Sequence, residues 1–161
     1  MTGVALVGFM GAGKSTIGPL LASRLGWPFV DLDACIEERV GLSPGEIITI
    51  WGEAVFRGVE RSTLLQQLAR DVPLVLATGG GVVEDPANLT ALGAWGSTVY
   101  LEVPLEELSR RVGAGDGRPL WAEAEARFRR RRPLYEQADH RVDAGVAPKQ
   151  VVDVIVEVLG C

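Results

Sequence analysis

Short apolar runs recur along the chain, and each is followed by at least one segment with helical spacing of its apolar positions. The expected strands are Val4–Val7, Pro28–Val30, Leu74–Ala77, Thr98–Leu101 and, more weakly, His140–Val142. The expected helices cover residues 14–25, 34–40, 53–70, 86–93, 105–112, 122–138 and 148–159. This alternation predicts an α/β protein of three layers, with a parallel sheet between two layers of helices. Ligands of such sheets bind at the carboxyl ends of the strands, so the residues that follow each strand are the ones to examine.

Length and composition narrow the class of protein. A chain of 161 residues without an internal repeat or a linker predicts one domain over residues 1–161. The hydrophobic fraction of 47% is ordinary for a soluble protein, and the run lengths exclude a membrane span. A net charge of −5 argues against nucleic acid as a partner. Cys35 and Cys161 lack metal-ligand spacing, which favours a reduced, cytoplasmic protein.

The first expected strand leads into the sequence Gly8-Phe9-Met10-Gly11-Ala12-Gly13-Lys14-Ser15, which has the spacing G-x-x-x-x-G-K-S. A glycine-rich loop between a strand and a helix lets several backbone N–H groups surround a phosphate, and the helix N-terminus adds its positive end. Lys14 supplies a charge for the β- and γ-phosphates, while the hydroxyl of Ser15 can hold Mg²⁺. The motif predicts binding of a nucleoside triphosphate.

Two carboxylates follow the second expected strand, in Asp31-Leu32-Asp33. One interpretation is structural, with Asp33 as the N-cap of the helix expected at residue 34. The functional interpretation, which we favour, places both side chains on the same side of an extended segment beside the phosphate loop. There one carboxylate would steer Mg²⁺ through water, and the other would accept a proton from an attacking hydroxyl.

Thr78 and three glycines, Gly79, Gly80 and Gly81, follow the third expected strand. They either form a loose turn or let a substrate approach backbone N–H donors closely, and both interpretations remain open. Arg57 and Glu60 are spaced i, i+3 on the helix expected at 53–70, which usually indicates a surface ion pair.

Four consecutive arginines occupy residues 129–132. On a helix they point in all directions, so at least one is expected to face inward or into a cleft. Residues 113–120 are rich in glycine and lie between two expected helices, which is typical of a mobile lid. Arg118 in this segment is placed to close onto a transferring phosphoryl group.

Together these segments resemble the shikimate kinase family over nearly the whole chain. The matching pieces occur in order and in register: residues 8–16, Asp31-Leu32-Asp33, Phe56-Arg57 with Glu60, Gly79–Gly81, Arg118-Pro119-Leu120 and Arg131-x-Pro-Leu-Tyr at 131–135. The resemblance implies the nucleoside monophosphate kinase class of P-loop fold, a five-stranded parallel sheet of order 2-3-1-4-5 with a mobile lid at about 113–121. It further implies transfer of the γ-phosphoryl group of ATP to the 3-hydroxyl of shikimate, a step towards the aromatic amino acids.

The resemblance also implies roles for individual residues. Asp33 would bind the ring hydroxyls and accept the reacting proton, and Asp31 would organise Mg²⁺ through water together with Ser15. Arg57 and Arg131 would hold the shikimate carboxylate, with Glu60 orienting Arg57. The shikimate-binding region would be about 32–61, joined by the triplet Gly79–Gly81. The ATP phosphates would contact Gly11, Ala12, Gly13, Lys14, Ser15, Thr16 and Arg118. ATP and shikimate are the only partners expected, and the protein is expected to be a monomer.

One segment departs from the family pattern. Many members carry an arginine two residues before the proline that opens the last helix, whereas Val146 and Ala147 precede Pro148 here. No adenine-contacting residue is therefore predicted. Another small-molecule kinase of the gluconate kinase type is the main alternative, and a GTPase switch is disfavoured because the motif Asn-Lys-x-Asp is absent.

Overall fold

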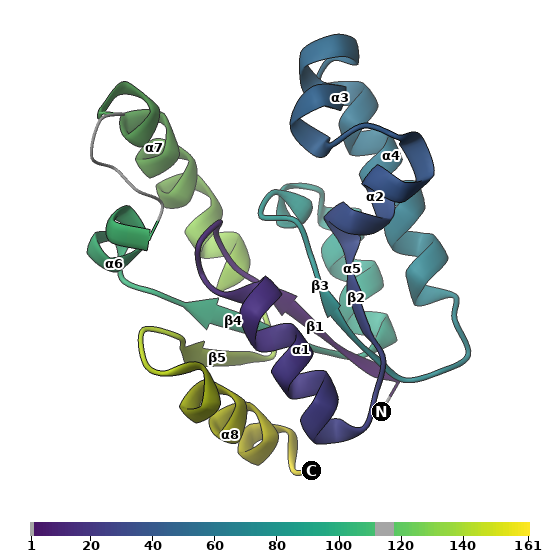
Figure 1. Ribbon diagram of the computed structural model, residues 1–161, viewed down its shortest axis with the longest axis vertical. Coiled ribbons are helices and arrows are strands. Elements are labelled where there is room, and N and C mark those ends of the chain that lie inside the picture. The colour runs from purple at the N-terminus through teal and green to yellow at the C-terminus, as the bar shows by residue number, and fades with distance from the viewer. Residues whose placement is uncertain (1, 112–117) are drawn as a thin grey trace.

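The five strands form one parallel sheet in the order β2-β3-β1-β4-β5 (Figure 1). The computed structural model describes residues 2–111 and 118–161. The central strands β1 and β3 are buried along their whole length, because helices cover both faces of the sheet. This confirms the fold expected from the sequence. The strands are β1 Gly3–Val7, β2 Phe29–Asp31, β3 Leu74–Ala77, β4 Ser97–Glu102 and β5 His140–Asp143.

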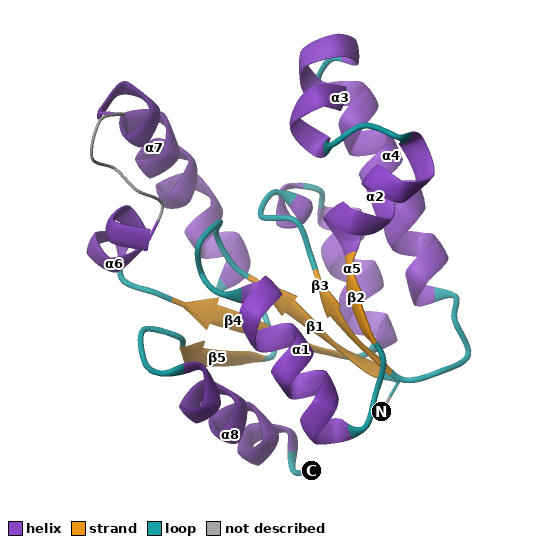
Figure 2. Cartoon of the chain, viewed as in Figure 1, coloured by secondary structure: helices purple, strands orange, loops and turns teal. Residues whose placement is uncertain are grey.

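The helices divide between the two faces of the sheet (Figure 2). α1 and α8 pack together on one face, and α5 packs with α4 on the other. α2, α3 and α4 form a helical extension beyond the carboxyl end of β2, and α7 rises beyond the opposite part of the sheet (Figure 1). The helices are α1 Lys14–Leu25, α2 Leu32–Val40, α3 Pro44–Trp51, α4 Glu53–Leu68, α5 Pro86–Trp95, α6 Leu105–Arg111, α7 Arg118–Tyr135 and α8 Pro148–Leu159, with a short 3₁₀ helix, η1 Val82–Glu84.

Two elements were not expected from the apolar pattern, α3 and η1. α3 nevertheless carries a readable start signal, since Ser43 and Glu46 form a capping box around Pro44. The expected start of α2 at residue 34 is also wrong, because β2 ends at Asp31 and the helix begins at Leu32. This two-residue shift changes the surroundings of both acidic residues.

The connections place a crevice beside β1. β1 pairs with β3 on one side and with β4 on the other, so the chain turns to opposite sides of the sheet at this strand. Such a switch point opens a ligand crevice at the carboxyl ends of the strands. The loop that carries the G-x-x-x-x-G-K-S spacing leaves β1 at this position. Within the described residues, every helix is too short or too polar to cross a membrane.

Candidate active site

The loop after β1 has the backbone conformation of an anion cradle. Gly8, Gly11 and Gly13 have φ values of 155°, 80° and 103°, which L side chains rarely adopt. Gly13 is the N-cap of α1, and no side chain caps that end of the helix. The first N–H groups of α1 therefore remain available to a phosphate, next to the positive end of the helix.

Lys14 lies inside this loop. Its Nζ donates hydrogen bonds to the carbonyl oxygens of Gly8 and of Phe9, the latter at 3.0 Å. Burial lowers the pKa of Lys14 to about 8, with Asp33 and Asp31 opposing the shift and Arg131 adding to it. The amino group is therefore held beside the loop, where the negative charge of a bound phosphate would favour its protonated form.

Asp31 caps α2 and contacts Ser15. One carboxylate oxygen accepts hydrogen bonds from the backbone N–H groups of Asp33 and Ala34, at 3.0 and 3.2 Å. The other oxygen, Oδ2, accepts one from the Ser15 hydroxyl at 3.1 Å. Asp31, and not Asp33, is thus the N-cap. The expected common extended segment is also wrong, since Asp33 lies in the first turn of the helix.

The Ser15 and Asp31 oxygens fit a magnesium ion in their chemistry. Mg²⁺ takes hard oxygen ligands and usually keeps several waters, so few protein ligands suffice. Within residues 2–111 and 118–161, no three acidic, histidine or cysteine side chains gather into a metal cage. A cation at this position would therefore depend on Ser15, on Asp31 and on the phosphates of a nucleotide.

Asp33 faces the same cavity as the loop. Burial raises the pKa of Asp33, Asp31 adds to the rise, and Lys14 and Arg57 oppose it. A raised pKa makes a carboxylate a better proton acceptor near neutral pH. The cavity measures about 400 Å³ and is lined by Met10, Gly11, Gly13, Lys14, Ser15, Thr16, Asp31, Asp33, Thr78 and Gly80.

Charged side chains from other elements crowd against two of the three glycines after β3, Gly79 and Gly81. A Cβ on Gly81 would lie 2.4 Å from Nη2 of Arg57 and 2.8 Å from Nη2 of Arg131. A Cβ on Gly79 would lie 3.0 Å from Glu60 and 3.1 Å from Asp33. The triplet is therefore not a loose turn: it leaves space for the charged groups that converge at this end of the sheet.

Arg57 reaches this cluster from α4. Its Nη1 donates to Oε1 of Glu60 at 2.9 Å, and Glu60 is only 1% exposed. The i, i+3 pair is thus an internal contact rather than the usual surface ion pair. Burial raises the pKa of Glu60, although the hydrogen bond from Arg57 opposes this. Glu60 fixes the guanidinium of Arg57 while its other donors remain directed to Glu53 and Glu84.

One arginine of the run at 129–132 is buried, as the helical pattern predicts. The side chain of Arg131 is 8% exposed, whereas those of Arg129, Arg130 and Arg132 are more than half exposed. Arg131 donates to Glu84 at 3.0 Å. A Cβ on Gly80 would lie 3.4 Å from Arg131 and 3.7 Å from the Gly8 carbonyl, so Arg131 and the phosphate loop meet across Gly80.

Tyr135 ties the end of α7 to the glycine triplet. Its hydroxyl donates to the carbonyl oxygen of Gly80, and its ring stacks on Tyr100 of β4 with centroids 5.3 Å apart. Both rings are fully buried. This contact positions α7, and with it Arg131, relative to the sheet.

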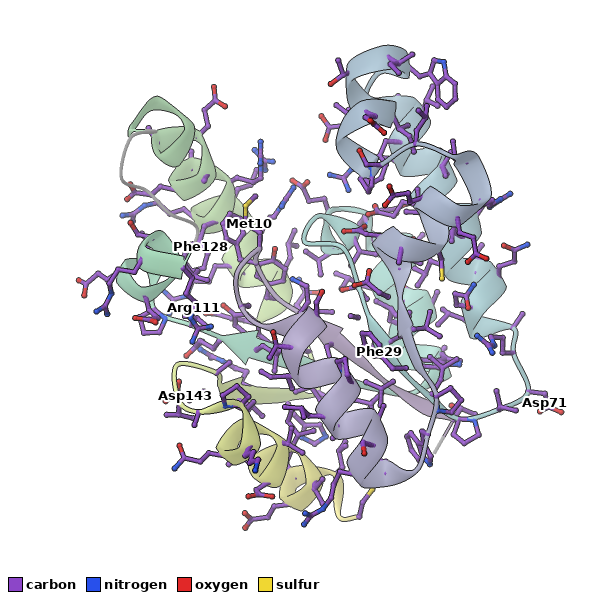
Figure 3. The ribbon with its side chains drawn as sticks, in the orientation of Figure 1. Met10, Phe29, Asp71, Arg111, Phe128 and Asp143 are labelled. Atoms are coloured by element: carbon purple, nitrogen blue, oxygen red, sulfur yellow. The ribbon has the colours of Figure 1, made fainter. Side chains whose placement is uncertain are left out.

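Arg111 lies beside the phosphate loop, a position that the sequence did not indicate. Its guanidinium donates to the carbonyl oxygen of Gly11 at 3.1 Å and to that of Ala144 at 3.0 Å, joining the phosphate loop to the loop after β5 (Figure 3). Beside it lies a cavity of about 240 Å³, lined by Gly11, Ala12, Gly13, Thr16, Ile17, Arg111, Ala144, Val146 and Pro148. The pattern gave no signal for Arg111 because it ends an ordinary amphipathic helix, α6.

Glu84 lies beside the candidate site, and the sequence did not indicate this either. It ends η1, and its carboxylate contacts Arg57, Arg130 and Arg131. A single glutamate in a loop carries no motif, so only the fold reveals these contacts.

A larger cavity lies elsewhere. It measures about 940 Å³ and is lined by residues of β4, β5 and α7 and by the segment after β4. Several of its charged groups are already paired with neighbours, as Arg132 is with Glu136 at 3.0 Å. The smaller cavity at the phosphate loop, with Lys14 and two acidic groups converging on it, is therefore the candidate site.

Residues 113–117 of the predicted lid lie outside the described part of the structure, as do the side chains of residues 118–121. Arg118 is the first residue of α7. Its role remains a prediction from the sequence.

Comparison with known proteins agrees with this geometry. The family model for shikimate kinase matches residues 10–160. A shikimate kinase of Synechococcus sp. (strain RCC307) is 49% identical over 150 residues, which cover 89% of this chain and 76% of that protein. One from Persephonella marina is 38% identical over 165 residues, covering 99% and 98% of the two chains.

Solved structures of shikimate kinases are also similar to this chain. The chain superposes on shikimate kinase from Bacteroides thetaiotaomicron with a TM-score of 0.92 at 31% identity, covering 99% of both chains. The structure of the Acinetobacter baumannii shikimate kinase in complex with shikimate gives 0.90 at 32% identity, covering 99% of this chain and 93% of that one. A gluconokinase from Sinorhizobium meliloti, at 18% identity and a TM-score of 0.66, shares the fold alone. The family match over almost the full length and the identities above 30% show that the chain belongs to the shikimate kinase family.

Proposed function

We propose that this chain transfers the γ-phosphoryl group of ATP to the 3-hydroxyl of shikimate. The observation that carries the proposal is that the phosphate loop and Asp33 line one cavity, while the guanidinium groups of Arg57 and Arg131 converge on the glycine triplet, of which Gly80 lines the same cavity. A triphosphate cradle and a carboxylate-binding pair thus flank a carboxylate able to act as a base. That arrangement suits a compact cyclic acid that presents a hydroxyl group to ATP.

Positioning and charge neutralisation supply most of the catalysis in phosphoryl transfer. Lys14 and the N–H groups of the loop bind and orient the phosphates, and Ser15 and Asp31 would hold Mg²⁺. When bound, the ion neutralises phosphate charge. Asp33 accepts the proton of the attacking hydroxyl. Arg57 and Arg131 orient the acceptor through its carboxylate, and Arg118 is assigned to the transferring group. The phosphate contacts are assigned to Gly11, Ala12, Gly13, Lys14, Ser15, Thr16 and Arg118, and the shikimate contacts to Asp33, Arg57, Gly79, Gly80, Gly81 and Arg131.

The cavity beside Arg111 is the proposed site of the adenine base. It adjoins the phosphate loop at Gly11 and Thr16, so a nucleotide with its phosphates in the loop can extend into it. The planar guanidinium of Arg111 can stack on a base, while Val146 and Pro148 supply apolar contact. This assignment replaces the arginine that many family members place before the last helix.

The remaining proposals concern the molecule in its setting. A single domain over residues 1–161, with a lid at about 113–121 and an acceptor region at about 32–61, follows from the family pattern. The region 32–61 comprises α2, α3 and the first part of α4. We further propose a cytoplasmic monomer whose partners are ATP and shikimate, without nucleic acid or membrane among them.

A coupled assay of ADP release tests the proposal. Purified protein with Mg²⁺ and ATP is supplied with shikimate, with gluconate or with no acceptor. We expect turnover with shikimate, and little ADP release in the other two reactions. Faster turnover with gluconate would favour the alternative kinase, and equal ADP release in all three would reject an acceptor-specific kinase.

A further inference from the structure

A carboxylate of the protein already occupies the space between the two arginines assigned to the acceptor. Oε2 of Glu84 accepts a hydrogen bond from Arg131 at 3.0 Å and one from Arg57 at 3.3 Å. Its other oxygen, Oε1, accepts two from Arg130, at 2.9 and 2.7 Å. One carboxylate group therefore bridges three guanidinium groups from two helices.

The backbone around Glu84 is held in place from α5 and α4. η1 starts directly after Gly81, and the buried side chain of Asn88 donates to the Val82 carbonyl oxygen at 3.1 Å. Arg61 in turn donates to Asn88 at 3.1 Å. The side chain of Glu84 is 22% exposed. These contacts fix the backbone of η1, so the fold places the side chain of Glu84 between the arginines.

Glu84 carries its charge at neutral pH. Burial by itself would raise its pKa, but the hydrogen bonds and charges of Arg130 and Arg131 outweigh burial and lower the pKa of Glu84. A second carboxylate that approached Arg57 and Arg131 would meet this charge directly. Two carboxylates on one pair of cations repel each other, so one of them must move.

We propose that Glu84 determines acceptor affinity and selectivity as the resident carboxylate that the acceptor's own carboxylate must displace from Arg57 and Arg131. This inference depends on the proposed function, since it requires an acidic acceptor. Arg130 retains Glu84 after the displacement, because its two hydrogen bonds go to the oxygen that does not face Arg57 and Arg131. Simple anions lack further contacts in the cavity and do not displace Glu84, whereas shikimate also gains the contacts to Asp33.

The first test is Glu84→Gln, which keeps the size and an acceptor oxygen but removes the competing charge. We expect the KM for shikimate to fall about fivefold, with kcat and the KM for ATP unchanged. Glu125→Gln is the matched control. Glu125 is a carboxylate on α7 that pairs with the exposed Arg129 at 2.8 Å and contacts neither Arg57 nor Arg131, so its removal should leave the KM for shikimate unchanged.

Arg130→Gln gives a second, opposite test at an exposed position. Without Arg130, Glu84 depends entirely on Arg57 and Arg131, so displacing it becomes harder and the KM for shikimate should rise about threefold. The double variant should return to the KM of Glu84→Gln. With the methyl ester of shikimate, which carries no charge, neither variant should differ from wild type.

The outcomes separate the inference from the proposed function. An absence of shikimate-dependent turnover in the wild-type protein rejects the function, and the inference with it. Shikimate turnover in wild type with an unchanged or raised KM in Glu84→Gln rejects the inference alone, because Glu84 would then merely support the arginines. Thermal unfolding of each variant checks that it is folded. If Glu84→Gln does not fold, an unchanged or lowered KM in Arg130→Gln overturns the inference.

Discussion

At the scale of single residues, the site combines groups whose charge is expensive to bury with partners that offset that cost. Lys14 and Asp33 have pKa values that burial shifts towards their neutral forms, and each is drawn back by the other's charge. Such opposed shifts are common at catalytic sites. We therefore expect ATP binding and turnover to depend on pH through these two residues.

Lys14 predicts a pH dependence of ATP binding. In the free protein its pKa is about 8, and the phosphates of ATP would raise it. Below pH 8 the lysine is protonated with or without ATP, so the affinity is constant. Above pH 8 the free protein must take up a proton on binding, so the Kd should increase with pH, by up to about tenfold per unit.

Calorimetric titrations at pH 7 and pH 9, in buffers with different ionisation enthalpies, measure this proton uptake. Lys14→Arg is the control, because arginine stays charged and should remove the uptake even if it binds ATP more weakly. The same proton uptake in that variant would assign it to another group.

The proposed role of Asp33 as a base predicts that its replacement lowers turnover and that kcat/KM of the wild-type protein falls at acidic pH. Asp33→Asn should lower kcat about a hundredfold or more, because the amide cannot accept the proton of the hydroxyl. In the wild-type protein, kcat/KM should fall as the pH drops through the pKa of Asp33, which lies above the ordinary aspartate value. Near-normal turnover of Asp33→Asn, measured by ADP release, would remove Asp33 from the proton transfer.

At the scale of elements, two helical glycines show how packing determines the effect of one residue on stability. Gly58 in α4 faces open space, whereas a Cβ on Gly18 in α1 would lie 2.2 Å from the ring of Phe29. Both are helical glycines, and helix propensity alone favours alanine at each. At Gly18, however, the ring of Phe29 in β2 leaves no space for the alanine side chain.

The two alanine substitutions should therefore have opposite effects on stability. Gly58→Ala should raise the free energy of unfolding by about 0.5–1 kcal/mol, because alanine restricts the unfolded chain and suits the helix. Gly18→Ala should lower it by about 1–3 kcal/mol through overpacking. Urea denaturation followed by circular dichroism measures both. A stabilising Gly18→Ala would mean that Phe29 rotates away without cost.

At the scale of the whole molecule, the proposed acceptor site joins elements that are distant in the sequence. Arg57 lies on α4, Arg131 on α7 and Asp33 on α2, and they meet where the loops after β1 and β3 end. A ligand that contacts all of them must stabilise the folded state as a whole, since the unfolded chain cannot bind it.

Arg131→Ala should separate the two ligands in a thermal unfolding experiment. At a hundred times its Kd, a ligand adds about 2.7 kcal/mol to the stability of the folded state. Shikimate and a non-hydrolysable ATP analogue should each raise the Tm of the wild-type protein. In the variant the shift with shikimate should largely disappear while the shift with the analogue remains. Equal losses for both ligands would contradict a role confined to the carboxylate.

The sequence by itself determined the class of fold, the phosphate loop and the family, because apolar periodicity and glycine spacing are local properties of the chain. Which residues contact one another could be determined only from the tertiary structure. Asp31 rather than Asp33 caps α2 because of where β2 ends, and the glycine triplet is crowded because Arg57 and Arg131 converge on Gly81. Arg111 and Glu84 carry no motif of their own. Their partners lie on other elements, and only the tertiary structure brings those partners within hydrogen-bonding distance.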